Sequence, residues 1–132
     1  MPGYGTNIER EARSNDDFRR VLFTGPHSQL VLMTLKPGED IGLESHADTD
    51  QFVRVESGRG AAVLNGQEHL LEDGSAVVIP AGTTHNIMNR APSESLRRYT
   101  LYAPPERPDG RVNRTKAEAM EYEARHHGGA GR

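Results

Sequence analysis

The chain contains neither cysteine nor tryptophan among its 132 residues. Without cysteine it can form no disulfide bridge, no thiolate metal site and no cysteine nucleophile. Aromatic residues make up only 5% of the composition, and no apolar stretch approaches the roughly 18 residues that a membrane-spanning helix requires. The first residues hold no apolar segment typical of a signal peptide. From these absences we expect a soluble, cytoplasmic protein that does not bind a membrane.

The chain also carries fewer basic than acidic residues. The 16 Lys and Arg residues are outnumbered by 19 Asp and Glu residues, the formal net charge is −3, and the basic residues form no run. Nucleic-acid binding depends on clustered basic side chains that neutralise phosphates. We therefore predict no nucleic-acid partner and expect a small-molecule substrate or ligand.

The middle of the chain carries short apolar segments separated by turn residues. The Asn65-Gly66 pair between two of them is a strong signal for a two-residue hairpin. Turn signals recur about every eight to twelve residues, a spacing typical of an all-β barrel or sandwich. The predicted strands are residues 18–23, 30–35, 51–56, 60–64, 67–71, 76–79, 85–89 and 96–102.

The two ends differ from this β-rich centre, so the sequence divides into three parts. Residues 1–17 are charged and hold few apolar groups, and we expect them to form a flexible N-terminal arm. Residues 18–103 form the barrel. Residues 104–132 form a C-terminal extension that begins as an irregular, Pro-rich connector. A Thr-x-x-Glu spacing then predicts a helix over 115–124, followed by a disordered end.

One segment places a histidine directly after a sharp turn. It runs from Gly74 to Asn89 and reads GSAVVIPAGTTHNIMN. Residues 76–79 are an apolar run suited to a buried strand, and a proline and a glycine then break the ladder and turn the chain. His85 begins the return strand, where a rigid wall can hold the ring in place. Neutral imidazole is the commonest protein ligand of divalent transition metals, so His85 is a candidate metal ligand.

A second polar cluster lies upstream. Glu44 and His46 are two residues apart, so their side chains face the same way on an extended backbone. Gln51 begins the next strand and alternates onto one face with Val53 and Val55. We predict that Gln51 points inward with these valines.

The last predicted strand alternates as well. Arg98, Thr100 and Tyr102 share one face, and Tyr99 and Leu101 share the other. Either tyrosine would line the interior if its face points inward, and the sequence leaves that choice open.

The two clusters resemble the paired motifs of the cupin superfamily, G-x5-H-x-H-x3,4-E-x6-G and G-x5-P-x-G-x2-H-x3-N. The second motif matches at every fixed position, and the first matches at its glycines and at His46. Between the motifs lie 15 residues, from Arg59 to Asp73, a usual gap for small single-domain bacterial cupins of the mannose-6-phosphate-isomerase-like kind. The resemblance implies a cupin-type jelly-roll β-barrel, a homodimer, and metal ligands inside the barrel.

Carried over by position, those ligands are Glu44, His46, Gln51 and His85, with Glu44 and Gln51 in place of the family's usual His and Glu. Two histidines and one carboxylate are the donor set of non-haem iron(II) sites, and Gln51 can add a carbonyl oxygen. Iron, manganese, nickel and zinc all suit such a set. Two other roles remain open: Glu44 as a general base, and Gln51 as a hydrogen-bond donor that orients a ligand or water.

These residues favour a divalent-metal-binding cupin that acts as an enzyme on a small polar molecule. Dioxygenase chemistry would need a redox metal and access for O2, whereas isomerase or lyase chemistry would need a Lewis acid and a base. The alternative is a non-catalytic cupin that binds a small molecule. The sequence assigns no catalytic residue, because one fold hosts many chemistries.

Overall fold

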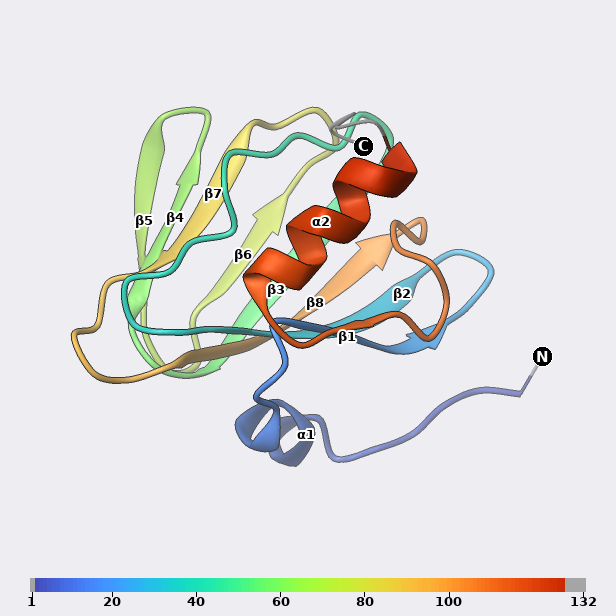
Figure 1. Ribbon diagram of the computed structural model, residues 1–132, viewed down its shortest axis with the longest axis horizontal. Helices are drawn as coiled ribbons and strands as arrows, with labels where there is room; N and C mark the ends of the chain where they lie inside the picture. The colour runs from blue at the N-terminus through green and yellow to red at the C-terminus, as the bar shows by residue number, and fades with distance from the viewer. Residues whose placement is uncertain (1, 128–132) are drawn as a thin grey trace.

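Two antiparallel β-sheets make up most of the computed structural model, which describes residues 2–127 (Figure 1). The larger sheet has six strands in the order β6-β3-β8-β2-β1-β9, and the smaller has three in the order β5-β4-β7. The strands are β1 (Arg19–Thr24), β2 (Gln29–Leu35), β3 (Asp50–Ser57), β4 (Gly60–Leu64), β5 (Gln67–Leu71), β6 (Ala76–Ile79), β7 (His85–Asn89), β8 (Leu96–Ala103) and β9 (Val112–Asn113). This is the expected all-β, cupin-type jelly-roll architecture.

The core lies between the two sheets, where apolar side chains alternate inward along the strands. Val31 of β2, Val53 and Val55 of β3, Ala62 of β4 and Ile87 of β7 are all fully buried. Burying a valine or isoleucine side chain contributes about 1.5–3 kcal/mol. A rigid wall of this kind holds the polar side chains that also face inward.

The eight predicted strands are confirmed to within one residue at each end. The Asn65-Gly66 hairpin is confirmed too, because Leu64 pairs with Gln67 across it. Both central residues have positive φ, 48° for Asn65 and 84° for Gly66, as a type I′ turn requires. The two-residue strand β9 was not predicted, since so short a segment carries no periodicity.

The N-terminal segment corrects one expectation. Residues 1–17 were expected to be a flexible arm, but Ile8–Ser14 form helix α1. The side chain of Asn7 caps this helix by accepting a hydrogen bond from the Arg10 amide at 2.9 Å. Ala12 is buried, and Asn15 just after the helix bonds the Thr34 hydroxyl on the outer face of β2 at 3.0 Å. The helix therefore packs against the outside of the large sheet.

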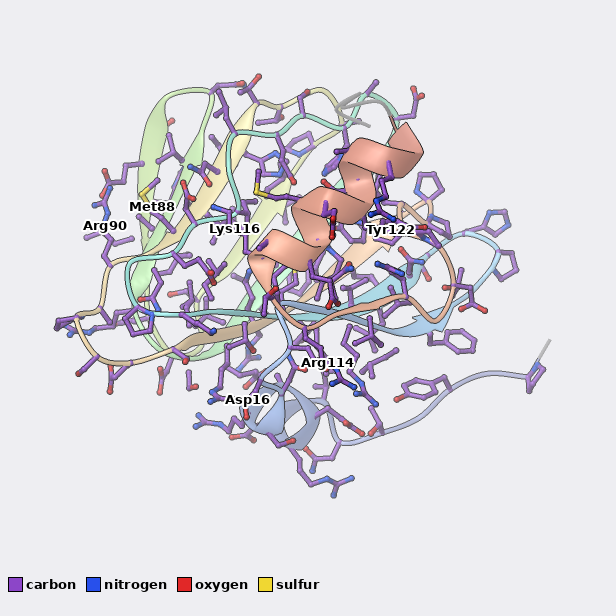
Figure 2. The ribbon with its side chains drawn as sticks, in the orientation of Figure 1. Asp16, Met88, Arg90, Arg114, Lys116 and Tyr122 are labelled. Atoms are coloured by element: carbon purple, nitrogen blue, oxygen red, sulfur yellow. The ribbon has the colours of Figure 1, made fainter. Side chains whose placement is uncertain are left out.

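The predicted C-terminal helix is confirmed as α2 (Lys116–His127). Its start is a capping box, because the Glu118 amide donates to the Thr115 hydroxyl at 3.1 Å and the Glu118 carboxylate accepts from the Arg114 amide at 3.0 Å. Figure 2 shows Lys116 in the first turn, where it binds Asp40 at 2.7 Å. The disorder predicted for the end falls mainly on residues 128–132, which lie outside the described residues.

Helix α2 lies across one side of the barrel (Figure 1). Asp40, its partner at one end, forms a β-bridge with Met88 of the small sheet. Glu123, near its other end, binds Arg19 of the large sheet at 2.9 Å. The C-terminal extension thus ties the two sheets together across one side of the barrel. No helix within residues 2–127 is both long and apolar enough to cross a membrane.

Candidate metal centre

Glu44 and His85 are neighbours across a two-residue β-bridge. The amide of each donates to the carbonyl of the other at 2.8 Å, so the loop before β3 is fastened to the start of β7. This pairing sets the carboxylate of Glu44 beside the ring of His85, with 3.8 Å between Oε1 and Nε2.

His46 completes a cluster inside the barrel. Its Nε2 lies 3.4 Å from the same Oε1 of Glu44, and its ring centre is 5.5 Å from that of His85. One ligand atom from each of the three residues falls within 4.8 Å of the others. His46 and His85 are 4% and 1% exposed. The structure therefore brings together three of the four predicted ligands.

The ring of His85 is oriented by a backbone carbonyl. Its Nδ1 lies 3.0 Å from the Thr83 oxygen, and a carbonyl can only accept, so Nδ1 carries the proton. The lone pair is then on Nε2, the atom that faces Glu44. Within the described residues this Nε2 is buried and has no hydrogen-bond partner, as expected of a ligand atom directed at a metal ion.

Gln51, the fourth predicted ligand, is buried and points inward, as its alternation with Val53 predicts. It pairs in register with Tyr102 of β8, whose ring packs edge-on against His46 at 6.0 Å. Its Oε1 has no hydrogen-bond partner among residues 2–127. An unsatisfied buried carbonyl oxygen beside the cluster suits a ligand, and the coordination of Gln51 stays a prediction.

A second carboxylate supports His46 from the connector after β8. Oε2 of Glu106 lies 3.4 Å from Nδ1 of His46, and Thr49 donates to its other oxygen at 2.9 Å. The connector is held by Gln29, whose Oε1 accepts from the amides of Glu106 and Arg107 at 3.1 and 2.9 Å. Glu106 thus orients the ring as carboxylates do behind metal-bound histidines. The sequence analysis missed Glu106 because irregular connectors carry no periodic signal.

Charge is concentrated around this cluster. Burial alone would lower the pKa of His46, but Glu106 and Glu44 outweigh it and raise the pKa to about 10. Burial alone would raise the pKa of Glu44, but hydrogen bonding to His46 and the charge of Arg107 lower it to about 2. Burial lowers the pKa of His85. Without metal, His46 is therefore charged at neutral pH and His85 is neutral.

Three arginines with little exposed side chain surround the cluster, and the sequence analysis gave none of them a role. Arg107 lies 3.9 Å from Glu44 and, like Arg19, binds Glu123 of α2. Arg98 is on the inward face of β8 with Tyr102. Of the two tyrosines between which the sequence left the choice open, Tyr102 is therefore the one that lines the interior. Alternation in the sequence already placed Arg98 and Tyr102 on the same face of the strand. Knowing which face points inward would have identified both as residues near the site.

The donor set fits a divalent ion. Two imidazole nitrogens and one carboxylate suit iron, manganese, nickel or zinc, and the buried, unsatisfied Nε2 of His85 is the atom that such an ion would satisfy. Glu44 keeps a fifth of its side chain accessible to water, so the cluster is not sealed. A metal ion here could present open positions to a small molecule.

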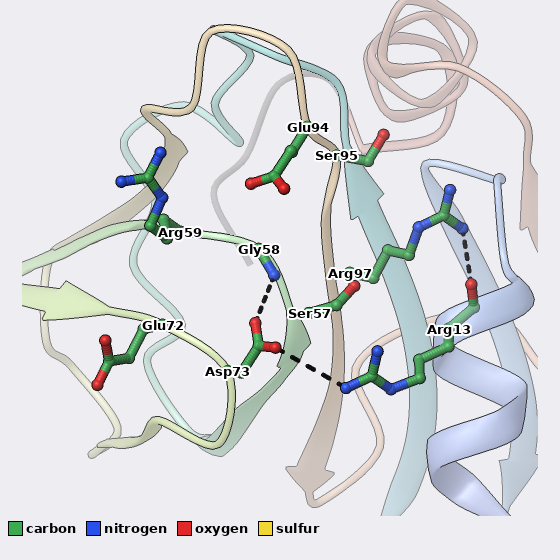
Figure 3. Close-up of a pocket in the computed structure, with 9 residues that line it drawn as sticks. All are labelled: Arg13, Ser57, Gly58, Arg59, Glu72, Asp73, Glu94, Ser95 and Arg97. Atoms are coloured by element: carbon green, nitrogen blue, oxygen red, sulfur yellow. Dashed lines mark hydrogen bonds and ion pairs between the residues drawn. The ribbon is translucent and has the colours of Figure 1, made fainter.

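A polar surface pocket lies elsewhere (Figure 3). It is lined by residues of α1 and of the loops beside β3, β5 and β8, and none of the predicted ligands belongs to it. Its charges are partly paired with one another, since Asp73 accepts from the Gly58 amide at 2.8 Å and lies 3.9 Å from Arg13. No cluster of metal-binding residues occurs in this pocket within the described chain.

The two sheets form a β-barrel, and the Glu-His-His cluster lies on its inner wall. This arrangement is typical of small barrel proteins that hold a metal or ligand site inside the barrel. Residues 31–99, just over half of the chain, match the cupin domain family. The chain belongs to the cupins.

Individual relatives agree with this assignment. The chain is 47% identical over 120 residues to the uncharacterised protein YrkC of Bacillus subtilis, covering 86% of this chain and 64% of that protein. A crystal structure from Bacillus halodurans superimposes with a TM-score of 0.87 and 44% identity, over 91% of this chain and 95% of that one. Quercetin 2,3-dioxygenase of Bacillus subtilis is 32% identical over 78 residues, 59% of this chain and 23% of the enzyme. The match to this chain therefore covers less than two thirds of the length of YrkC and less than a quarter of the length of the dioxygenase.

Proposed function

We propose that this cupin binds one divalent metal ion through Glu44, His46 and His85, with Gln51 as a fourth ligand, and acts on a small polar molecule. The observation that carries the proposal is the convergence of two imidazole Nε2 atoms on one oxygen of Glu44, at 3.4 and 3.8 Å. The fixed tautomer of His85 and the unsatisfied oxygen of Gln51 support it.

A bound ion would act as a Lewis acid or, if it is redox-active, support O2 chemistry. The residues around it have separate roles. The Thr83 carbonyl orients the ring of His85, and the Glu106 carboxylate orients that of His46. Arg107 and Arg98 supply positive charge. Similarity to a quercetin dioxygenase favours the dioxygenase form. The isomerase or lyase form requires a base, and Glu44 can serve as one only if it does not coordinate the ion.

Calorimetric titration with Ni2+ tests metal binding directly. We expect one ion per chain and a rise in melting temperature with free metal concentration. Because His46 is protonated below a pKa of about 10 and must lose that proton to coordinate, affinity should rise about tenfold per pH unit between pH 6 and 9. Burial lowers the pKa of His85, which is neutral in the upper part of this range, and Glu44 is ionised throughout it, so about one proton is released per ion at pH 8. A flat titration curve at pH 8 would contradict the proposal.

Elemental analysis of protein purified without oxygen then separates the two reactions. Iron in the isolated protein, together with O2 consumption on incubation with candidate substrates, supports the dioxygenase form. Zinc, with no activity restored by iron, excludes it. If the protein binds no metal and melting is unchanged by chelators, the non-catalytic binding function is favoured.

We also propose a homodimer built on the outer face of the large sheet. An apolar row crosses this face in register: Val78 pairs with Phe52, Phe52 with Leu101, and Leu101 with Leu30. Val78 is 63% exposed and Leu101 39%. An uncharged row can pack against its own copy about a twofold axis, so that the same patch serves both subunits.

Replacing Val78 with lysine should therefore shift the protein from dimer to monomer. Val78 is exposed, so the charge disturbs the row without entering the core. Light scattering after size exclusion would measure the mass. Leu70→Lys is the matched control, because Leu70 is 78% exposed on the other sheet. A wild-type protein that elutes as a monomer at micromolar concentration would contradict the dimer.

A further inference from the structure

Arg98 is a buried cation without an ionic partner. It is 1% exposed on β8, opposite Met33 of β2 and Val55 of β3. Its Nη1 donates to the Thr100 hydroxyl at 2.7 Å and its Nη2 meets the Met33 sulfur at 3.2 Å. Its Nε is buried with no hydrogen-bond partner, and among residues 2–127 the neighbouring carboxylates Glu44 and Glu123 pair with Arg19 and Arg107 rather than with Arg98. Buried arginines are ordinarily paired, because an uncompensated charge is costly to bury.

The guanidinium extends along the inward face of β8 to Thr100, on the face that also carries Tyr102. Its bond to Thr100 draws it along β8 in the direction of Tyr102, and the ring of Tyr102 contacts His46. The charge of Arg98 interacts with that of Glu44, and it contributes to the lowered pKa of His85. Burial lowers the pKa of Arg98 to about 10, so the side chain remains charged at neutral pH.

The carboxylates nearby are already engaged. Glu123 binds Arg19 and Arg107 together, and Glu44 lies between His46, His85 and Arg107. A divalent ion would add further positive charge at Glu44. The interior then holds an excess of positive charge with one free guanidinium, and a small anion is the group that would balance it.

We propose that Arg98 binds the carboxylate of a small organic acid whose other oxygen atoms reach the metal centre. A planar guanidinium with unused N–H groups matches a carboxylate in shape and charge. The proposal rests on the function proposed above and names its substrate class: a small organic anion rather than a neutral sugar or phenol.

Calorimetry of the nickel-loaded protein tests this with formate, pyruvate and 2-oxoglutarate, and with pyruvamide as the neutral counterpart of pyruvate. We expect at least one of the acids to bind, and pyruvate to bind more tightly than pyruvamide. Arg98→Met keeps the length of the side chain without its charge, and should weaken acid binding about tenfold or more. Arg98→Lys should recover part of the affinity. Metal content should be unchanged in both variants, and pyruvamide binding should change less than acid binding.

Melting temperature gives a second readout. Arg98→Met removes a buried uncompensated charge, so without ligand the variant should melt at the wild-type temperature or above it. Acid affinity equal to that of the wild type, together with a drop of several degrees, would show that Arg98 serves packing alone. Failure of all three acids to bind the wild type would also overturn the proposal.

The two proposals fail separately. Full nickel occupancy without binding of any acid rejects the role of Arg98 and leaves the metal function intact. Absence of nickel binding rejects the metal function. Acid binding to metal-free protein that is lost in Arg98→Met would then retain Arg98 as the anion site.

Discussion

Replacing His85 with alanine is expected to abolish stoichiometric metal binding. His85 supplies a buried nitrogen whose lone pair is directed at Glu44 by the Thr83 carbonyl, and no other described side chain nearby offers a replacement nitrogen in the same position. Altering a residue behind a ligand costs about 10–100-fold in affinity, so removing the ligand itself should cost more than about 100-fold. Metal content after dialysis, and the shift in melting temperature with added Ni2+, measure the loss.

His69→Ala is the matched control for His85→Ala. His69 is an exposed histidine on β5, outside the cluster, and its loss should leave metal content unchanged. Retention of one ion per chain by His85→Ala would refute the assignment of this cluster as the metal centre. Circular dichroism of both variants excludes unfolding as the cause.

Gly60→Ala should destabilise the fold by about 3 kcal/mol. Gly60 begins β4 opposite Asn89 of β7. A Cβ there would collide with the backbone oxygen of Met88 and lie 3.2 Å from Cδ2 of Leu96. A paired strand cannot move aside as a flexible side chain does, so the small sheet has to shift. Urea denaturation followed by circular dichroism gives the free energy of unfolding.

Gly5→Ala provides the comparison, because nothing lies within 4 Å of a Cβ at that position. Its free energy of unfolding should match that of the wild type. A Gly60→Ala midpoint equal to the wild-type midpoint would mean that the two strands are not in close contact. Since β7 begins with His85, Gly60→Ala should also weaken metal binding.

Much of the barrel could be predicted from sequence because its signals are local. Glycines and prolines separate the strands, and alternation within β3 placed Gln51 inward with the valines. The motif around Asn89 has a physical basis, since its side-chain amide donates to the carbonyls of Leu35 and Glu94 at 3.0 and 2.7 Å. That residue fastens the start of the β7–β8 connection to β2.

What the sequence did not predict depends on contacts between distant parts of the chain. Glu106 reaches His46 only because Gln29, 77 positions earlier, holds the connector. Helix α1 has seven residues, too few to be stable without packing against the large sheet. The ligand cluster was predicted from a family resemblance, whereas the charges that surround it emerge only from the folded structure.

The C-terminal extension changes what counts as the working unit of this protein. The family match ends at residue 99, yet Glu106, Arg107 and Glu123 all contribute charge to the centre from beyond that point. Two cupins with the same barrel ligands can therefore differ in chemistry through their tails alone. In redesign, substitutions at Glu106, Arg107 or Glu123 would change the electrostatics of the centre while leaving the predicted metal ligands in place.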